Sequence, residues 1–148
     1  MKNKMIIRYK KIHPLAAPPV FGSIHSAGAD LCAISGEDIV IAPGKTEFIH
    51  TGLAIEVPVG YAGLVYARSG LASKSGLAPA NKVGVIDSDY RGEILVALHN
   101  HSETAAAVRG GDRIAQLIIA PVPAVEYVES DDLSDTLRGS GGFGSTGK

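Results

Sequence analysis

The sequence predicts an all-β sandwich or barrel that contains one short helix. Two observations support this fold class. Short runs rich in apolar and β-branched residues recur along the chain, and turn-forming residues separate them. The 148 residues include 18 glycines and 8 prolines, and short, regularly punctuated strands are typical of sandwiches and barrels. This length suits one domain with its own core.

The first predicted strands lie between residues 37 and 67. A turn at Pro43-Gly44 separates "EDIVIA" from "KTEFIHTG". The next run, "TGLAIEVPVGYAGLVYA", alternates between apolar and other residues, as a half-buried strand does. It places four side chains on one face before a turn at Gly60: Leu53, Ile55, Val57 and Val59.

The one predicted helix covers "SGLASKSGL", from Ser69 to Leu77, with Ser69 as N-cap and Gly76 at its end. Two further strands are predicted in "GEILVALHNHS" and "DRIAQLIIAPV". Between the helix and these strands, "DSDYRG" at residues 87–92 has the composition of a hairpin loop.

Composition excludes several classes of protein. The net charge of −1 gives no basic field for nucleic acid, and 5% aromatic residues make a nucleic-acid-binding barrel a poor alternative. The single cysteine, Cys32, excludes an intramolecular disulfide framework and a cysteine-based zinc site. No signal peptide or membrane-spanning run is evident. We therefore expect a cytoplasmic protein with neither a nucleic-acid nor a membrane partner.

The C-terminal stretch "RGSGGFGSTGK" resembles a phosphate-binding loop only in part. Residues 142–148 spell G-x-x-x-x-G-K, but a P-loop needs a Ser or Thr after the lysine, a strand before and a helix after. From about Glu129 the strand periodicity is lost, and composition alone favours a disordered tail. The sequence thus predicts a β domain at residues 1–128 and a flexible arm at 129–148.

Four other stretches combine glycine with charged or hydroxylated residues: "SAGADLCA" (26–33), "ARSGLA" (67–72), "NKVGVIDSDYRGEI" (81–94) and "GGDRIAQLII" (110–119). Each alone has an ordinary explanation, such as a turn, a helix cap, a hairpin loop or, for Arg113, an ion pair in a subunit interface. Together with the C-terminal stretch, and in this order, they resemble the five motifs of the trimeric deoxyuridine triphosphate nucleotidohydrolases (dUTPases). Ala67 and Ser75 depart from the usual proline and histidine, at positions that carry no chemistry in that family.

This resemblance covers Ser26 to Thr146 and implies a jelly-roll-like subunit in a homotrimer, with three active sites at subunit interfaces. It also implies that dUTP and water give dUMP and pyrophosphate with the help of Mg²⁺. That reaction limits uracil in DNA and supplies dUMP for thymidylate synthesis. The structural expectations are tested below.

The resemblance also assigns roles to individual residues. Asp87 matches the aspartate that activates the attacking water, and Asp30 the one that holds metal-bound waters. Tyr90 matches the ring that lies against the deoxyribose and excludes a 2′-hydroxyl. Base and phosphate contacts are implied for six more residues: Asn81 and Gly84 at the base, and Arg68, Ser69, Gly70 and Gln116 at the phosphates.

For the C-terminal arm, the resemblance implies a lid that closes over a nucleotide bound largely by the other two subunits. Phe143 would stack on uracil. Arg138, Ser145 and Thr146 would contact the γ-phosphate, and backbone N–H groups around Gly144 would wrap the phosphates. A lid that is disordered when empty agrees with the composition.

Two alternatives to dUTP hydrolysis stay open at this point. A dCTP deaminase of the same superfamily, alone or bifunctional, would need a further acid or base, and Asp87 and Asp89 are the carboxylates within the base-reading loop, with Glu93 just beyond it. A non-catalytic trimer that senses nucleotide or binds a protein partner is the other.

Overall fold

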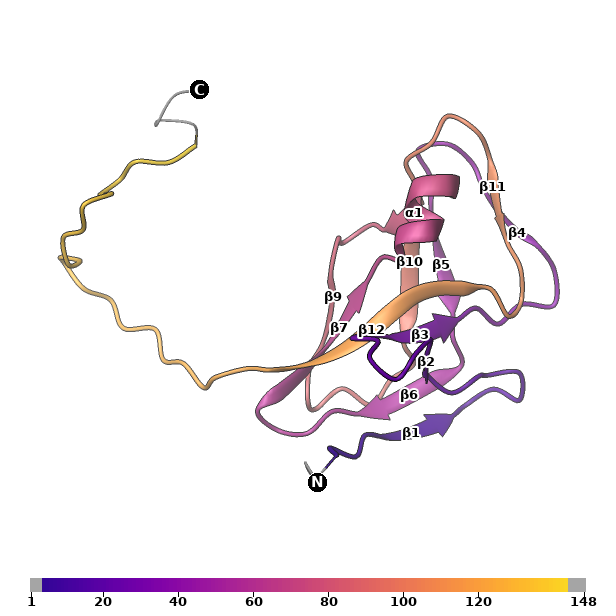
Figure 1. The fold of residues 1–148 in the computed structure, drawn as a ribbon, viewed down its shortest axis with the longest axis horizontal. Coiled ribbons are helices and arrows are strands. Elements are labelled where there is room, and N and C mark those ends of the chain that lie inside the picture. Colours follow the sequence, from indigo (N-terminus) through magenta and orange to yellow (C-terminus); the bar gives the residue numbers. More distant parts are fainter. Residues whose placement is uncertain (1–3, 144–148) are drawn as a thin grey trace.

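The computed structural model describes residues 4–143 and confirms the all-β prediction (Figure 1). Within these residues the largest sheet has five strands, in the order β2-β3-β12-β7-β9, and a second has three, in the order β5-β10-β8. Their bounds are β2 Val20–Phe21, β3 Ala29–Cys32, β12 Arg113–Pro121, β7 Tyr61–Tyr66, β9 Gly84–Ile86, β5 Thr46–His50, β10 Leu95–Asn100 and β8 Leu77–Pro79.

Two short ladders complete the described β structure. Strand β1 (Arg8–Lys11) pairs with β6 (Leu53–Glu56), and β4 (Ile39–Ile41) pairs with β11 (Ala106–Val108). The pairings recorded for these residues are all antiparallel. One helix, α1 (Ser69–Ser75), connects β7 to β8.

One hydrophobic core joins the two larger sheets. It includes Leu31 of β3, Ile49 of β5 and Leu98 of β10, none of which is exposed to solvent. Because successive side chains of a strand point to opposite faces, burying one set turns the other set outward. In this way Asp30 is turned away from the core by buried Ala29 and Leu31.

The predicted apolar face of residues 53–59 is correct for three of its four members. Leu53, Ile55 and Val57 are buried, but Val59 is 91% exposed. The reason is that β6 ends at Glu56 and the chain turns over Pro58–Gly60, where Gly60 has a positive φ of 83°. The alternating apolar pattern in the sequence therefore continues past the end of the strand and includes Val59, which lies in the turn.

The helix prediction is correct in position and at its C-terminus but wrong about its N-cap. Gly76 ends the helix in the left-handed conformation and its N–H donates to the Ala72 carbonyl. The N-cap residue is Arg68, which is extended and makes no side-chain capping bond. Ser69 is the first helical residue, and its carbonyl accepts a hydrogen bond from the Ser73 hydroxyl at 2.7 Å.

The hairpin predicted at residues 87–92 is also wrong. Strand β9 pairs with β7, whereas β10 pairs with β5 and β8, so the two strands that flank this loop belong to different sheets. The loop from Asp87 to Glu93 crosses from one sheet to the other. Turn composition locates such a loop but does not reveal which strands pair beside it.

Asn100 is a buried polar residue that fastens the end of β10. Its Nδ2 donates to the Ile41 and Thr104 carbonyls at 2.8 Å each, and its Oδ1 accepts from the backbone N–H and hydroxyl of Ser102. The side chain is completely buried, so water has no access to its partner groups if the amide is removed.

We expect Asn100→Ala to lower the free energy of unfolding by about 2–4 kcal/mol, because it leaves several buried polar groups without partners. Chemical denaturation at neutral pH measures the change. Glu103→Ala is the control, since Glu103 is exposed in the neighbouring loop. A loss for Asn100→Ala as small as that control would show that water replaces the amide.

The described chain after β12 forms an extended arm that leaves the β body (Figure 1). The Val122 N–H still donates to the Gly60 carbonyl at 2.8 Å, but residues 122–143 contain no helix or strand. Several apolar side chains of the arm are exposed, including Tyr127, Leu133 and Leu137. Among residues 4–143, no helix has the length and apolar character needed to cross a membrane.

Candidate active site

A hollow of about 260 Å³ lies where β9, the loop after it and β10 meet. It brings together four residues that the sequence analysis singled out, namely Asn81, Gly84, Asp87 and Tyr90. The rest of its lining comes from β5, β7, β8, β9, β10 and the loop between the sheets: Phe48, Val65, Pro79, Val85, Ile86, Glu93, Ile94, Leu95, Val96 and Ala97.

Asp87 follows the last residue of β9, Ile86, which is buried and anchors the start of the loop. The Asp87 side chain is exposed, and no residue in the described part of the chain donates a hydrogen bond to its carboxylate. Its oxygens are therefore available to a water molecule at the mouth of the hollow. A carboxylate with free oxygens can accept a proton from such a water molecule.

Tyr90 is held by contacts within the same loop. Its hydroxyl donates to the Glu93 carbonyl at 2.8 Å, and its backbone N–H donates to the Asp87 carbonyl at 3.2 Å. The ring lies against Gly92, where an added Cβ would come within 2.6 Å of Tyr90 Cζ. The loop thus fixes the ring at one wall of the hollow.

Asn81 and Gly84 also line the hollow. Asn81 precedes Lys82, which has a positive φ of 65°, in the turn between β8 and β9. An added Cβ on Gly84 would lie 3.2 Å from the Val65 Cβ and 3.4 Å from the Asn81 amide nitrogen. The close approach that glycine allows here is to β7 of the same chain.

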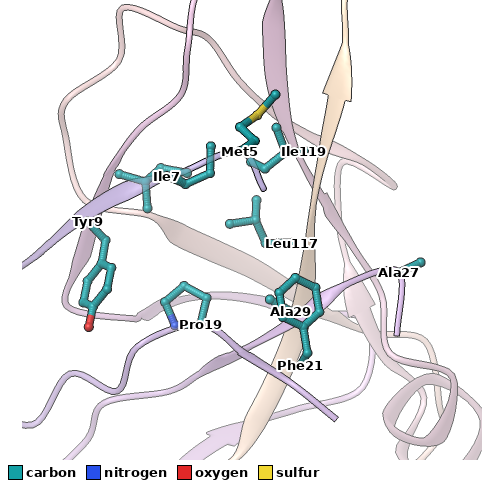
Figure 2. Close-up of a pocket in the computed structure, with 10 residues that line it drawn as sticks. Met5, Ile7, Tyr9, Pro19, Phe21, Ala27, Ala29, Leu117 and Ile119 are labelled. Atoms are coloured by element: carbon teal, nitrogen blue, oxygen red, sulfur yellow. The ribbon is translucent and has the colours of Figure 1, made fainter. Parts of the chain in front are cut away.

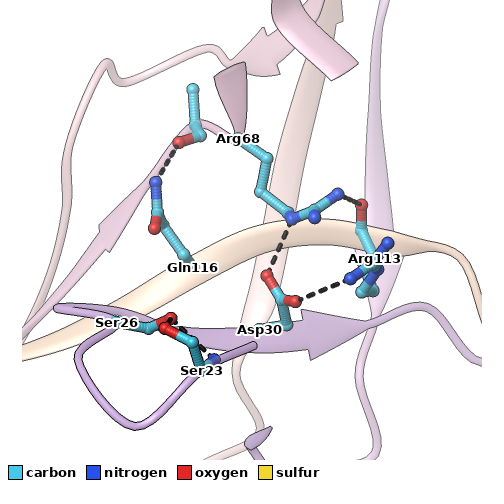
Figure 3. A network of polar contacts seen from close by, with 7 residues as sticks. Ser23, Ser26, Asp30, Arg68, Arg113 and Gln116 are labelled. Atoms are coloured by element: carbon cyan, nitrogen blue, oxygen red, sulfur yellow. Dashed lines mark hydrogen bonds and ion pairs between the residues drawn. The ribbon is translucent and has the colours of Figure 1, made fainter. Parts of the chain in front are cut away.

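A second polar cluster lies on the outer face of the five-stranded sheet (Figure 3). Asp30 accepts from Arg68 Nε at 2.7 Å through Oδ1 and from Arg113 Nη1 at 3.3 Å through Oδ2. Arg68 Nη1 also donates to the Arg113 carbonyl at 3.3 Å. The Asp30 and Arg68 side chains are only 16% and 25% exposed, so solvent screens this ion pair less than a typical surface pair.

Gln116 belongs to the same face, because it lies opposite Asp30 on β3 and Tyr66 on β7. Its Nε2 donates to the Ala67 carbonyl at 2.8 Å, an acceptor that exists whatever side chain stands at position 67. An added Cβ on Gly28 would collide with the Gln116 side chain, 2.7 Å from Oε1. Gln116 is therefore held tightly, beside the start of α1.

Ser69 and Gly70 are exposed in the first turn of α1, directly after Arg68. The first N–H groups of a helix have no acceptor within the helix, so they point outward and can bind an anion. With Arg68 they place donors next to the Asp30 cluster. The hollow and this cluster have no residue in common.

Two of the arm residues assigned by resemblance, Arg138 and Phe143, lie apart from both groups. Arg138 Nε donates to the Gly141 carbonyl at 2.8 Å, within the arm itself. Phe143 is fully exposed, with a φ of 52°. Gly144, Ser145 and Thr146 fall outside the described residues.

Sequence reasoning did not single out Phe48, Leu95 or the contact made by Arg113. Phe48 and Leu95 lie on neighbouring strands, where Phe48 pairs with Ala97 and Leu95 with His50, and nothing in their local sequence marks a site. Arg113 pairs with Asp30 of its own chain, whereas the sequence suggested a carboxylate across a subunit interface.

The fit of a metal ion depends on Asp30. Among residues 4–143 no three His, Cys, Asp or Glu side chains converge as a ligand group. Each Asp30 oxygen accepts one bond from an arginine and keeps a lone pair for another donor. A single carboxylate with spare lone pairs fits Mg²⁺ that keeps its own waters, with the protein bound through one of them.

A larger hollow of the described chain is a different one, an apolar groove of about 510 Å³ beside β1, β2 and β12 (Figure 2). Tyr9 contributes its one polar side chain; the other lining residues are Met5, Ile7, Pro19, Phe21, Ala27, Ala29, Ile55, Leu117 and Ile119. It contains no ionisable acid or base near neutral pH. The groove is larger than the hollow at Asp87, but its lining offers no carboxylate that could act on a water molecule.

Comparisons with known proteins support the assignment made from the motifs. The dUTPase family model matches residues 16–147. The deoxyuridine 5'-triphosphate nucleotidohydrolase of Nautilia profundicola is 49% identical over 97% of this chain and 100% of its own length. The enzyme of the same name from Desulfitobacterium hafniense is 50% identical over 97% of this chain and 96% of its own.

Among solved structures, a G164S mutant dUTPase of Staphylococcus bacteriophage 80alpha, determined with dUpNHpp, superposes with a TM-score of 0.89. It is 26% identical, and the match covers 98% of this chain and 100% of the phage protein. Motifs, fold and near-full-length identity agree: the chain belongs to the dUTPase family.

Proposed function

We propose that the protein hydrolyses dUTP to dUMP and pyrophosphate. The observation that carries the proposal is the hollow in which Asp87, Tyr90, Asn81 and Gly84 meet, in a chain that belongs to the dUTPase family. The relatives at 49–50% identity are named for this activity, and they match the chain over nearly its whole length.

In this proposal Asp87 orients a water molecule and accepts its proton as the oxygen attacks the α-phosphorus. The bond from that phosphorus to the bridging oxygen breaks, and pyrophosphate leaves. The free carboxylate at the mouth of the hollow supports this role. An exposed carboxylate is a weak base, so the fixed position of the water supplies much of the acceleration.

The phosphates would bind Arg68, the first N–H groups of α1 at Ser69 and Gly70, and the Gln116 amide. Asp30 would hold Mg²⁺ through bound water, and the ion would neutralise phosphate charge when present. Arg68 already donates to Asp30, so substrate would shift part of its hydrogen bonding from a carboxylate to a phosphate. This cluster supports phosphate binding by its position at the start of α1.

Asn81 and Gly84 would contact the uracil, and the base would lie between β8, β9 and β10. The hollow, at about 260 Å³, suits one pyrimidine nucleoside better than a whole nucleotide. A close-fitting pocket would exclude the methyl group of thymine by its size and cytosine by mismatched hydrogen bonds.

Membership of the dUTPase family supports assembly as a homotrimer with sites between subunits, and the separation of the two groups of site residues agrees with it. The hollow and the Asp30 cluster share no residue, so copies of the chain can supply them to one substrate. Uncovered apolar surface supports association: Phe48 is 66% and Phe21 58% exposed, the latter in the apolar groove (Figure 2).

The arm at residues 129–148 would be the lid, and residues 1–128 the domain it covers. Exposed Phe143 would stack on the uracil, Arg138, Ser145 and Thr146 would reach the γ-phosphate, and the backbone around Gly144 would wrap the phosphates. The support is the extended course of the described part of the arm, which makes its recorded hydrogen bonds within itself.

Tyr90→Ala is expected to relax selection against UTP, because the ring would no longer close the space beside the sugar 2′ carbon. We expect the ratio of kcat/KM for dUTP over UTP to fall by about tenfold or more. Tyr90→Phe keeps the ring and loses the hydrogen bond to the Glu93 carbonyl, so it should keep most of the selectivity. An unchanged ratio in the alanine variant would remove Tyr90 from this role.

A product assay on the purified protein with Mg²⁺ tests the function as a whole. With dUTP, dCTP, dTTP and UTP offered separately, pyrophosphate should appear efficiently from dUTP alone. Ammonia from dCTP would instead indicate a deaminase. The structure gives that alternative little support, because Glu93 bonds to His50 Nδ1 at 2.9 Å and to the Gly52 N–H at 2.8 Å. No product from any nucleotide would favour a binding protein.

A further inference from the structure

Arg91 lies in the loop that carries Asp87 and Tyr90, and its side chain turns back onto that loop. Its Nη1 donates to the Ser88 carbonyl at 2.8 Å and to the Tyr90 carbonyl at 2.9 Å. Both carbonyls belong to the turn that the Tyr90 N–H closes onto the Asp87 carbonyl. One guanidinium nitrogen therefore holds two backbone groups of the loop together.

The second terminal nitrogen of the Arg91 guanidinium faces a carboxylate that is held on the β1–β6 ladder. Arg91 Nη2 is 3.9 Å from Glu56 Oε1. Glu56 in turn accepts from Arg8 Nε at 2.8 Å and Nη2 at 2.9 Å, across the β1–β6 pair in which Arg8 and Glu56 are register partners. This hydrogen bonding from Arg8 holds the pKa of Glu56 below its ordinary 4.5, so the carboxylate is ionised at neutral pH.

A loop that crosses between two sheets has no strand ladder to define its shape. Within Asp87–Glu93 the recorded hydrogen bonds are the Tyr90 turn, the Tyr90 hydroxyl bond to Glu93 and the two bonds from Arg91. Half of this set depends on Arg91. The Asp87 carboxylate has no recorded hydrogen bond in the described chain, so its position depends on the turn whose Ser88 and Tyr90 carbonyls Arg91 holds.

We propose that Arg91 is a positioning residue for the Asp87–Tyr90 loop. The Glu56 carboxylate, held by Arg8 on the β1–β6 ladder, orients the Arg91 guanidinium. The proposal rests on the proposed hydrolysis of dUTP, and it gives the N-terminal strand β1 a part in that reaction. Arg91 need not touch the substrate. It acts by keeping Asp87 and the Tyr90 ring in the geometry that the reaction requires.

The test compares Arg91→Ala with Arg91→Lys and with a matched control, Arg109→Ala. Arg109 is also an exposed arginine in an ion pair, with Nε 3.2 Å from Asp38 Oδ2, and it contacts neither the loop nor the Asp30 cluster. We expect Arg91→Ala to lower kcat for dUTP by about 10- to 100-fold with KM changed less, since small misplacement of a catalytic group is costly. Arg91→Lys should recover part of kcat, and Arg109→Ala should behave as wild type.

Two further readouts separate positioning from general damage. The dUTP/UTP selectivity should fall in Arg91→Ala, because the Tyr90 ring is held by the same loop. Amide hydrogen exchange at residues 88–92 should become faster while exchange in β10 stays unchanged. Glu56→Gln should also lower kcat and speed up loop exchange, but by less than Arg91→Ala does, because an exposed ion pair at 3.9 Å is weak.

Equal kcat, selectivity and loop exchange in Arg91→Ala and Arg109→Ala would overturn the proposal. So would an effect confined to KM, which would make Arg91 a direct substrate contact. If wild-type protein does not hydrolyse dUTP, the proposed function fails by itself. Loop exchange then still decides: unchanged exchange in Arg91→Ala overturns the positioning role, and faster exchange supports it as a property of the loop.

Discussion

Asp87→Asn is expected to reduce kcat for dUTP by about 10²- to 10⁴-fold, the usual contribution of a general base. The amide keeps the size of the side chain but does not accept the proton of the attacking water at neutral pH. Asp87 is exposed at the hollow, and its carboxylate forms no recorded hydrogen bond with the described chain. The substitution should therefore leave both fold and pocket shape intact.

The measurement has two parts, turnover under saturating dUTP and binding of a non-hydrolysable dUTP analogue by calorimetry. We expect the analogue to bind Asp87→Asn with a Kd within about threefold of wild type, less than 1 kcal/mol. Asp89→Asn is the matched control, because Asp89 is a second exposed carboxylate two residues away in the same loop. It should retain most of the activity.

Two results would contradict the role of Asp87. Loss of analogue binding with near-normal kcat would make Asp87 a ligand of the substrate. Equal losses in Asp87→Asn and Asp89→Asn would point to the overall negative charge of the loop. Because the two residues share sequence context and exposure, the comparison separates position from charge.

The outward direction of Asp30 and Gln116 is the part of the site that sequence patterns predict best. Both residues lie between buried neighbours on their strands, Ala29 and Leu31 for one, Ala115 and Leu117 for the other. Pleating alone then puts both side chains on the outer face of the sheet. Their adjacency across β3 and β12 needs the pairing register, which only the structure supplies.

The features that were missed or wrong have a common physical cause. Phe48 enters the hollow because β5 pairs with β10, and residues 87–92 cross between sheets because β9 and β10 pair with different partners. Strand pairing is a long-range property, whereas turn residues report local backbone preference. The N-cap prediction was wrong because Asp30 anchors Arg68. With Arg68 held by this tertiary contact, the helix begins one residue earlier than predicted, and Arg68 rather than Ser69 is the N-cap.

Removal of residues 138–148 is expected to lower kcat/KM for dUTP by about 10²- to 10⁴-fold while leaving the Tm of the β domain unchanged. The lost contacts are one base stack, worth about 1–3 kcal/mol, and charge-assisted bonds to phosphate, worth about 1.5–3 kcal/mol. Stability should not change, because the described part of this segment, 138–143, makes its recorded hydrogen bonds only within residues 136–141.

A single substitution sharpens the same test. Phe143→Ala should raise the Kd of a dUTP analogue by about 5- to 150-fold, the equivalent of one lost stack. Leu137→Ala is the control, since Leu137 is an equally exposed apolar side chain six residues earlier on the arm. Equal effects would mean that the arm binds through general apolar contact. Full activity in the truncated protein would show that the domain closes its site without the arm, and the glycine-rich stretch would then need another explanation.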